Sequence, residues 1–237
     1  MERQMIVFRI LETKNKMKHK FSSLLLGFMC FSGTIVKSQD TTAKILKDTD
    51  HEKMVWFKEA KLGIFIHWGL YAVDGISESW SFYNEYLSHE DYLKQLSGFT
   101  AANFKPKEWA KLIKDSGAKY SVITSKHHDG FALWNTNYGH LNAVSHAAAK
   151  KDVLSPLIDA LKEKELKVGI YFSLPDWSSD LYTHFTTSKR RYAIEQDPQR
   201  WQQYLNYMNG QLLELKNNYT PDLWWFDGDW EHPPEAW

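Results

Sequence analysis

From residue 62 onward, the sequence alternates continuously apolar runs with amphipathic runs of helical periodicity. A strand that is apolar along its whole length is buried on both faces, as in a parallel sheet with helical crossovers. The alternation therefore predicts an α/β domain. The expected strands are 62–69, 119–130 (which runs into a polar loop), 167–177 and 221–228, and the expected helices are 106–118, 152–166 and 198–219.

Each expected strand ends, on its carboxyl side, in residues that can bind or react. In a (β/α)8 barrel the loops after all strands meet at one face, where active sites lie. A doubly wound sheet gathers its ligand groups at one switch point, usually beside a Gly-rich phosphate loop, and this sequence contains no such loop. We therefore expect a (β/α)8 TIM-barrel-like catalytic domain. The groups concerned are His67-Trp68, Lys126-His127-His128-Asp129, Ser173 with Asp176-Trp177, and Asp227-Gly228-Asp229.

About four strand–helix steps of such a barrel are visible before the sequence ends at Trp237. Half a barrel would leave two open sheet edges and an exposed apolar interior. Two explanations are open, a fragment of a longer chain and pairing with a second copy, and we favour the fragment. Residues 56–237 are expected to be the N-terminal half of the catalytic domain, truncated after about four strands.

The N-terminal 38 residues have the features of a secretory signal. A basic region precedes an apolar stretch at 21–36, and Val36-Lys37-Ser38 has small residues at the −3 and −1 positions of a cleavage site. We expect a signal peptide at 1–38 with cleavage near Ser38, a polar leader at 39–55, and a secreted or periplasmic protein with no membrane attachment after cleavage. The alternative is a transmembrane anchor, for which the apolar run is short.

Composition narrows the function classes. Cys30 is the only cysteine and lies within the expected signal, so the mature protein would contain no disulfide, thiol nucleophile or thiolate metal site. The 29 basic and 29 acidic residues balance, without the basic excess of a nucleic-acid binder. Aromatic residues make up 15 % of the chain. They fill a core or line a sugar-binding cleft, and composition alone favours the core.

Asp227 and three histidines are the strongest site candidates. A carboxylate at the tip of a strand, beside Trp225 and Gly228, suits a nucleophile that attacks an anomeric carbon, and it could equally cap the following loop. Neutral imidazoles suit the binding of vicinal hydroxyls, or a metal with an aspartate as a further ligand. These histidines are His67, His127 and His128.

A retaining glycosidase also needs a general acid/base, a second carboxyl group about 5 Å from the nucleophile. The spacing singles none out among the available carboxylates. On the residues alone, the sequence thus predicts a barrel enzyme with an aromatic-rich, sugar-like site. The available carboxylates are Glu78, Asp129, Asp176, Asp229, Glu231 and Glu235.

Several segments together resemble the α-L-fucosidases of glycoside hydrolase family 29. They occur in the family's order and cover most of residues 52–230. The combination of His-Trp-Gly, Lys-His-His-Asp-Gly-Phe and Trp-Phe-Asp-Gly is highly specific, although each motif alone would be weak. The matching stretches are 61–73, 104–120, 123–134, 151–174 and 221–228.

The resemblance implies a retaining exo-α-L-fucosidase that releases terminal L-fucose from a fucosylated oligosaccharide or glycoconjugate by double displacement, with no metal or organic cofactor. Asp227 matches the family nucleophile. Trp225 would lie against the apolar C6 methyl group of the sugar. The other substrate-binding positions that the resemblance implies are His67, Glu78, Trp80, His127, His128 and Tyr171, and Trp68 is expected with them because it adjoins His67 at the strand end.

Two departures from the family pattern stand out. The family often shows an adjacent Glu-Trp pair, whereas here one residue separates Glu78 from Trp80. The family's acid/base Glu lies in a loop well beyond the nucleophile, and Glu231 and Glu235 come too early to match it. We therefore expect the 237-residue chain to be inactive alone. Competing interpretations are another retaining glycosidase on the same barrel, a non-catalytic fucose-binding module, and a metal-dependent amidohydrolase.

Overall fold

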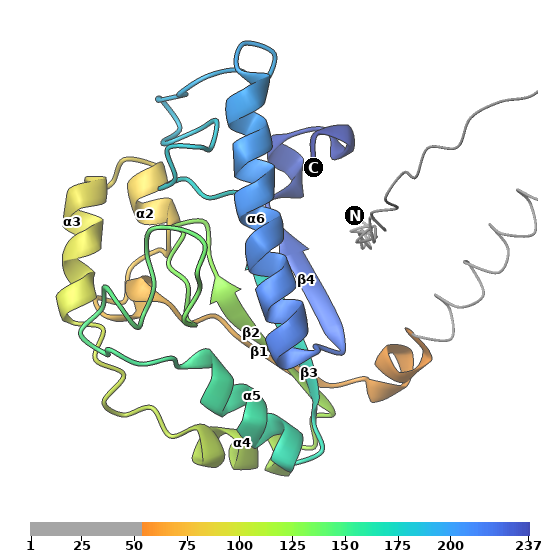
Figure 1. Ribbon diagram of the computed structural model, residues 1–237. Helices are drawn as coiled ribbons and strands as arrows, with labels where there is room; N and C mark the ends of the chain where they lie inside the picture. The colour runs from red at the N-terminus through yellow and green to blue at the C-terminus, as the bar shows by residue number, and fades with distance from the viewer. Residues whose placement is uncertain (1–53) are drawn as a thin grey trace, which may run out of the picture. The chain divides into compact units, whose positions relative to one another are not determined.

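The computed structural model describes residues 54–237. The chain divides into a unit at 1–59, of which residues 54–59 are described and helical, and a unit at 60–237 (Figure 1). The expected signal peptide at 1–38 and all but the end of the expected leader at 39–55 lie outside the described residues.

The second unit contains a sheet, three long helices and several short ones, in the order β1(Gly63–Ile66), η1(Leu70–Ala72), α2(Trp80–Tyr83), α3(His89–Leu93), η2(Lys94–Ser97), α4(Pro106–Asp115), β2(Tyr120–Lys126), α5(Leu154–Glu163), β3(Lys167–Ser173), α6(Pro198–Tyr219), β4(Leu223–Asp227), η3(Asp229–Glu231) and η4(Pro234–Ala236). All four expected strands and all three expected helices are present. The short helices between β1 and α4 were not predicted, because their five residues or fewer show no usable periodicity.

The strand order is β1-β2-β3-β4, and every pairing is parallel. Helices α4, α5 and α6 connect successive strands and lie on the same face of the sheet (Figure 1). Lys162 of α5, for example, donates a hydrogen bond to the Tyr219 carbonyl at the end of α6 (2.5 Å). A doubly wound sheet would reverse its strand order and place helices on both faces. Sequential order with one-sided helices is the arrangement of a barrel.

Local signals explain where the long helices begin and end. Helix α6 starts with Pro198, behind Asp197, whose carboxylate accepts a hydrogen bond from the Arg200 backbone N–H (3.0 Å). It ends at Tyr219, and the next residue, Thr220, has a left-handed backbone (φ 45°) and precedes a proline. The start of α5 is stabilised in a similar way, because the Asp152 carboxylate accepts hydrogen bonds from the N–H groups of Leu154 (2.8 Å) and Ser155 (2.9 Å).

The sheet curls toward the face that carries no helices. Strands β1 and β4 would lie about 14 Å apart in a flat sheet, three interstrand spacings. The rings of Phe65 on β1 and Trp225 on β4 nevertheless have their centroids only 5.3 Å apart. Strands β2 and β3 are buried along almost their whole length, whereas Phe65 and Trp225 are 37 % and 39 % exposed. The curl therefore makes a concave face that opens at the two edge strands.

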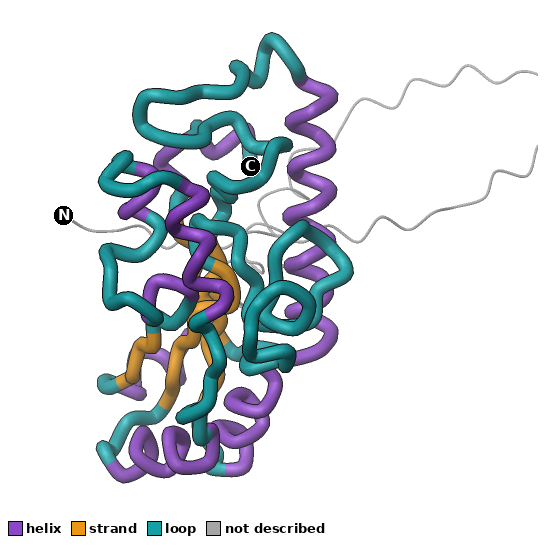
Figure 2. Tube along the Cα trace, turned by 90° about the vertical axis from the view of Figure 1, so that its left-hand side faces the viewer, coloured by secondary structure: helices purple, strands orange, loops and turns teal. Residues whose placement is uncertain are grey.

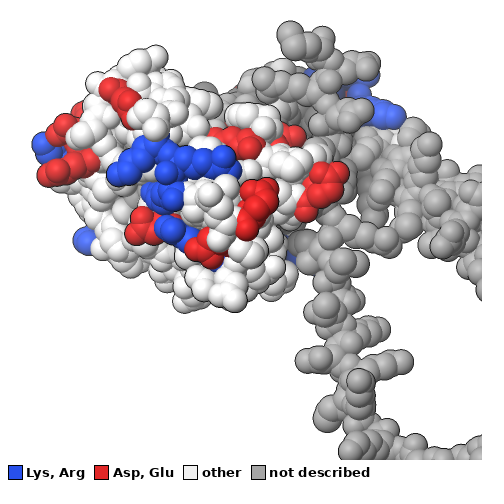
Figure 3. Space-filling model, turned by 90° about the horizontal axis from the view of Figure 1, so that it is seen from above, with Lys and Arg blue, Asp and Glu red and all other residues white. Residues whose placement is uncertain are grey.

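Long loops gather at one end of the sheet, the carboxyl end of the strands (Figure 2). Seen from that side, Lys and Arg side chains form a band with Asp and Glu groups around it, not a continuous basic surface (Figure 3). Within residues 54–237, no helix is both long and apolar enough to span a membrane.

Candidate active site

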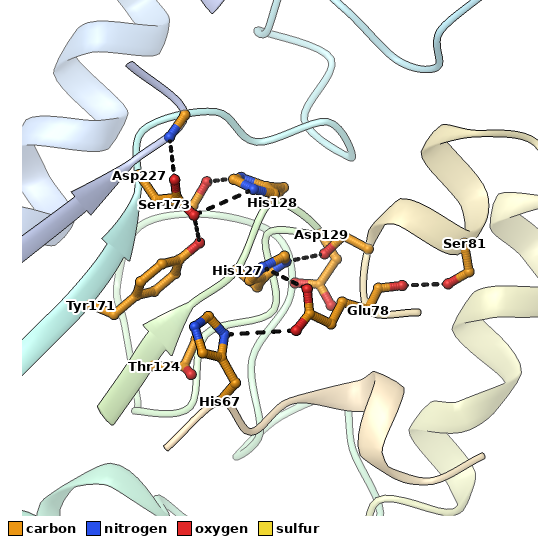
Figure 4. Close-up of polar contacts among 12 residues, drawn as sticks. His67, Glu78, Ser81, Thr124, His127, His128, Asp129, Tyr171, Ser173 and Asp227 are labelled. Carbon is orange, nitrogen blue, oxygen red and sulfur yellow. Dashed lines mark hydrogen bonds and ion pairs between the residues drawn. The ribbon is translucent and has the colours of Figure 1, made fainter. Parts of the chain in front are cut away.

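All four strands deliver side chains to one site at their carboxyl ends (Figure 4). His67 follows β1, the pair His127-His128 follows β2, Tyr171 and Ser173 end β3, and Asp227 is the last residue of β4. Parallel strands necessarily bring these ends to one edge, so residues up to 160 positions apart in the sequence meet. The prediction that the strand-end groups share one face is thus confirmed for this set.

Asp227 is rigidly aimed. Its Oδ2 accepts a hydrogen bond from the Tyr171 hydroxyl (2.7 Å), and its Oδ1 accepts one from the Gly228 N–H (3.0 Å). The side chain remains 24 % exposed. Burial, reinforced by the charge of Asp227, raises the pKa of Tyr171, so that its phenol stays a hydrogen-bond donor at any physiological pH. The carboxylate is oriented by two donors and keeps access to solvent, as a nucleophile requires.

His128 faces this carboxylate in a defined tautomer. Its Nδ1 lies 2.5 Å from the Ser173 hydroxyl, which donates its own proton to the Pro175 carbonyl (2.7 Å). Nδ1 must therefore carry the proton, and Nε2 is left as an acceptor. Nε2 lies 3.9 Å from Asp227 Oδ2. The pKa of His128 is lowered to about 4, mainly by burial. The ring is therefore neutral and can accept a hydrogen bond from a hydroxyl group.

His67, Glu78 and His127 form a second group beside the first (Figure 4). Glu78 Oε1 lies 4.0 Å from His67 Nδ1, and Glu78 Oε2 lies 3.6 Å from His127 Nε2. His67 stacks on Phe65, with ring centroids 4.7 Å apart. Glu78 adopts a left-handed backbone conformation (φ 52°), which costs a non-glycine residue about 1–3 kcal/mol and is common at functional sites. Its carbonyl oxygen accepts a hydrogen bond from the Ser81 hydroxyl.

Buried hydrogen bonds hold His127 and Asp129 in place. His127 Nδ1 lies 2.6 Å from the Ser79 hydroxyl. The Tyr92 hydroxyl donates to Asp129 Oδ2 (2.5 Å). Burial raises the pKa of Asp129 to about 6, although hydrogen bonds from Tyr92 and the Phe131 N–H act in the opposite direction. Sequence reasoning missed Ser79 and Tyr92, because neither belongs to a recognisable motif.

Of the three tryptophans predicted at the site, two lie there and one packs elsewhere. Trp80 lies beside His128, with ring centroids 5.6 Å apart, and Trp225 precedes Asp227 by two positions on the same face of β4. Trp68 is not brought to this group. Its ring packs 5.0–5.4 Å from three other aromatic rings, which favours a role in the core. These rings are Phe99, Phe104 and Trp109.

Three of the carboxylates considered as acid/base are held in buried hydrogen bonds. Asp129 is bound by Tyr92, as described above. Asp176 is fully buried and accepts hydrogen bonds from Tyr207 (2.6 Å) and from Ser178 (2.8 Å). Glu231 accepts from the Trp177 indole (2.8 Å) and from Tyr182 (2.5 Å), and burial raises its pKa. These contacts give all three carboxylates a role in the structure.

The buried histidines make stability depend on pH. Burial is the main cause that lowers the pKa of His128 and of His232 to about 4, from 6.5 in the unfolded chain. Burial also lowers the pKa of His127 well below 6.5. Between pH 4 and 6.5 the unfolded chain therefore binds more protons, and the contribution of these rings to stability is lost as the pH falls through this window. Asp129 alone has the opposite effect. Because its pKa is raised in the folded protein, its contribution to stability increases as the pH falls.

We therefore expect the thermal unfolding midpoint to fall between pH 7 and pH 5, as measured by circular dichroism. Replacement of His232 by Gln should weaken this dependence, whereas replacement of His146, which is exposed, should leave it unchanged. A midpoint that rises on acidification would show that the burial of these rings does not control the pH dependence.

Comparison with known proteins identifies relatives over most of the chain. A family model described as alpha-L-fucosidase matches residues 29–237. The human plasma alpha-L-fucosidase is 33 % identical over 205 residues, which cover 77 % of this chain and 41 % of that protein. The chain thus spans about two fifths of the length of the curated relatives that it matches.

Solved structures of alpha-L-fucosidases are also similar to this chain. Alpha-L-fucosidase isoenzyme 1 from Paenibacillus thiaminolyticus has a TM-score of 0.66 at 34 % identity, over 78 % of this chain and 47 % of that chain. A trapped covalent intermediate of a family 29 alpha-L-fucosidase from Bacteroides thetaiotaomicron, in complex with 2-fluoro-fucosyl fluoride, has a TM-score of 0.66 at 33 % identity, over 76 % and 42 %. With the four-stranded parallel sheet, this likeness confirms the predicted fold class, a (β/α)8-type barrel of which about four strands are present.

Proposed function

Because this chain belongs to the alpha-L-fucosidase family, we propose that its protein is a retaining exo-α-L-fucosidase that hydrolyses terminal α-L-fucosyl linkages of fucosylated oligosaccharides or glycoconjugates. The observation that carries the proposal is Asp227. It ends β4, it is held by Tyr171 and Gly228, and it faces a group of neutral histidines. The covalent intermediate trapped in the Bacteroides relative supports a double displacement in this protein too.

The proposed reaction has two displacement steps at the anomeric carbon. Asp227 attacks the anomeric carbon, the bond to the leaving-group oxygen breaks, and that oxygen takes a proton from a general acid. The product of this step is a fucosyl ester of Asp227. A water molecule, deprotonated by the same acid/base group, then attacks the anomeric carbon, releases L-fucose and restores the carboxylate. Tyr171 donates a hydrogen bond that orients the Asp227 carboxylate before attack and after release.

The neutral imidazoles are proposed to bind the sugar hydroxyls. His128 Nε2 is an acceptor opposite Asp227, and His67 and His127 flank the Glu78 carboxylate. Acceptors and donors side by side match vicinal hydroxyls, each of which both donates and accepts. Trp225, exposed at the edge of the concave face, offers an apolar ring for the C6 methyl group.

We propose that the 237-residue chain does not complete the reaction alone. Asp129, Asp176 and Glu231 are held in buried hydrogen bonds, and the resemblance places the acid/base in a loop well beyond the nucleophile. Loss of one catalytic group commonly costs several orders of magnitude in rate. Activity of the 237-residue chain equal to that of the complete product of its gene would overturn this part of the proposal.

The substrate assignment is tested by a panel of p-nitrophenyl glycosides on the complete gene product. We expect the fastest release from the α-L-fucoside. Faster release from a β-galactoside would favour the alternative, another retaining glycosidase on the same barrel.

We also propose that the protein is exported and cleaved near Ser38. The relative named as a plasma enzyme supports export. The N-terminal residue of the mature protein, determined by mass spectrometry, tests this: an intact residue 1 in the exported or mature form would contradict the proposal.

Ser79 provides a prediction about positioning. Replacement of Ser79 by Ala removes the partner of His127 Nδ1, so we expect kcat/KM for the α-L-fucoside to fall about tenfold, equivalent to about 1.4 kcal/mol for one buried hydrogen bond. Replacement of Ser97, an exposed serine whose hydroxyl donates to the Lys94 carbonyl, is the matched control. An unchanged kcat/KM in the Ser79 variant would show that this hydrogen bond does not orient His127.

A further inference from the structure

His67, Glu78 and His127 converge from three separate segments of the chain, the end of β1, the loop before α2 and the end of β2. One nitrogen from each histidine and one carboxylate oxygen of Glu78 all lie within 4.8 Å of one another. Glu78 faces each ring with a different oxygen: Oε2 lies 3.6 Å from His127 Nε2, and Oε1 lies 4.0 Å from His67 Nδ1. Figure 4 shows both rings facing the carboxylate, each joined to it by a dashed line.

This donor set suits a transition metal. Two imidazoles and one carboxylate are the ligands of a common zinc site that keeps a fourth position open, and imidazole is preferred by zinc over magnesium or calcium. The supporting contacts fit as well. A histidine that ligates a metal typically hydrogen-bonds through its other ring nitrogen, and His127 Nδ1 lies 2.6 Å from the Ser79 hydroxyl. The negative charge of Asp227, which also acts on His67, favours a cation nearby.

The three ligand atoms would have to move closer together to form a coordination shell. Ligands 2.0–2.2 Å from a tetrahedral ion lie about 3.3–3.6 Å from one another. The three ligand atoms lie within 4.8 Å of one another, so the largest contraction needed is about 1.5 Å. The His67 and Glu78 side chains are 36 % and 37 % exposed and can adjust, whereas His127 is buried and fixed. The site thus has one rigid and two adjustable ligands.

We propose that His67, Glu78 and His127 bind one divalent transition-metal ion of the zinc class when no sugar is present, and that the ion and the sugar exclude each other. The mutual exclusion rests on the function proposed above, because it requires these side chains to hold the sugar. Binding of the ion itself does not. The ion is an inhibitor in this account and has no part in the reaction.

Isothermal titration of the complete gene product with ZnCl₂ tests the site directly. We expect one ion per chain to bind with an affinity that falls by more than about 100-fold in Glu78→Gln and in His67→Gln, since loss of an outer contact alone costs about 10–100-fold. Both positions are partly exposed, which keeps the variants foldable. His146→Gln, at an exposed histidine outside the site, should bind as the parent does. Zinc binding that is absent, or that both variants retain in full, would overturn the proposal.

A second titration in saturating L-fucose separates this proposal from the proposed function. We expect a weaker apparent zinc affinity in L-fucose. We also expect zinc to inhibit fucoside hydrolysis, EDTA to reverse this inhibition, and MgCl₂ not to reproduce it. These results together would support both the metal site and the proposed function. If zinc binding depends on Glu78 and His67 but L-fucose has no effect on it, the metal site stands. In that case the assignment of these residues to the sugar is wrong.

Discussion

Replacement of Asp227 by Gly is expected to lower the hydrolysis of p-nitrophenyl α-L-fucoside by the complete gene product about 10⁴-fold or more. The carboxylate is the proposed nucleophile, and nothing else in its immediate contacts can form an ester, because its neighbours are a phenol, a backbone N–H and a neutral imidazole. Without it the first displacement has no attacking group. Steady-state release of nitrophenolate measures the effect.

Azide provides the control for this variant. A small anion can enter the space that the side chain leaves and attack the anomeric carbon of a substrate whose leaving group needs no acid. We expect recovery of nitrophenolate release, with fucosyl azide of inverted configuration as the product. Asp229→Gly, a neighbouring carboxylate with the same substitution, should stay within about tenfold of the parent. Equal losses of activity in the Asp227→Gly and Asp229→Gly variants would contradict the assignment of Asp227 as the nucleophile.

Replacement of Gly228 by Ala is expected to lower kcat/KM about 100-fold, the cost of misplacing a catalytic group by about 1 Å. Gly228 has φ 84°, and a Cβ there would lie 2.2 Å from Pro175 Cδ and 2.4 Å from Pro175 Cγ. The proline ring is rigid, so the backbone at Gly228 must move. Its N–H orients Asp227 Oδ1, and the nucleophile would move with it.

Gly117→Ala separates this effect from backbone strain alone. Gly117 has nearly the same φ, 85°, but an added Cβ would meet nothing within 4 Å. Both variants should lose about 1–2 kcal/mol of stability to the left-handed conformation. Only the Gly228 variant should lose activity per folded molecule. Full activity in a folded Gly228→Ala protein would show that the contact between this loop and Pro175 does not position the nucleophile.

The fold and much of the site could be predicted from the sequence because both depend on short-range patterns. The buried strands are apolar throughout, and parallel pairing then forces His67, the His127-His128 pair and Asp227 to one edge. The ends of the expected strands were less accurate. The run at 62–69, for example, narrows to Gly63–Ile66, because pairing stops where the chain turns into the loop that carries His67.

The supporting contacts could not be predicted in the same way. Ser79 and Tyr92 meet His127 and Asp129 through short helices that lack periodicity, and their partners are 37 to 48 positions away. Trp68 was grouped with the site because it adjoins His67 in the sequence. Adjacent residues on an extended segment point to opposite sides, and its ring accordingly packs into an aromatic cluster.

The most direct test of the account is to trap the covalent intermediate. The complete gene product is incubated with 2-deoxy-2-fluoro-L-fucosyl fluoride, digested, and analysed by tandem mass spectrometry. We predict one 2-fluorofucosyl group per molecule, in ester linkage to Asp227, with activity lost in proportion to labelling. A label on another carboxylate, or continued turnover of the fucoside with no ester formed, would contradict the proposal that Asp227 is the nucleophile of a retaining fucosidase.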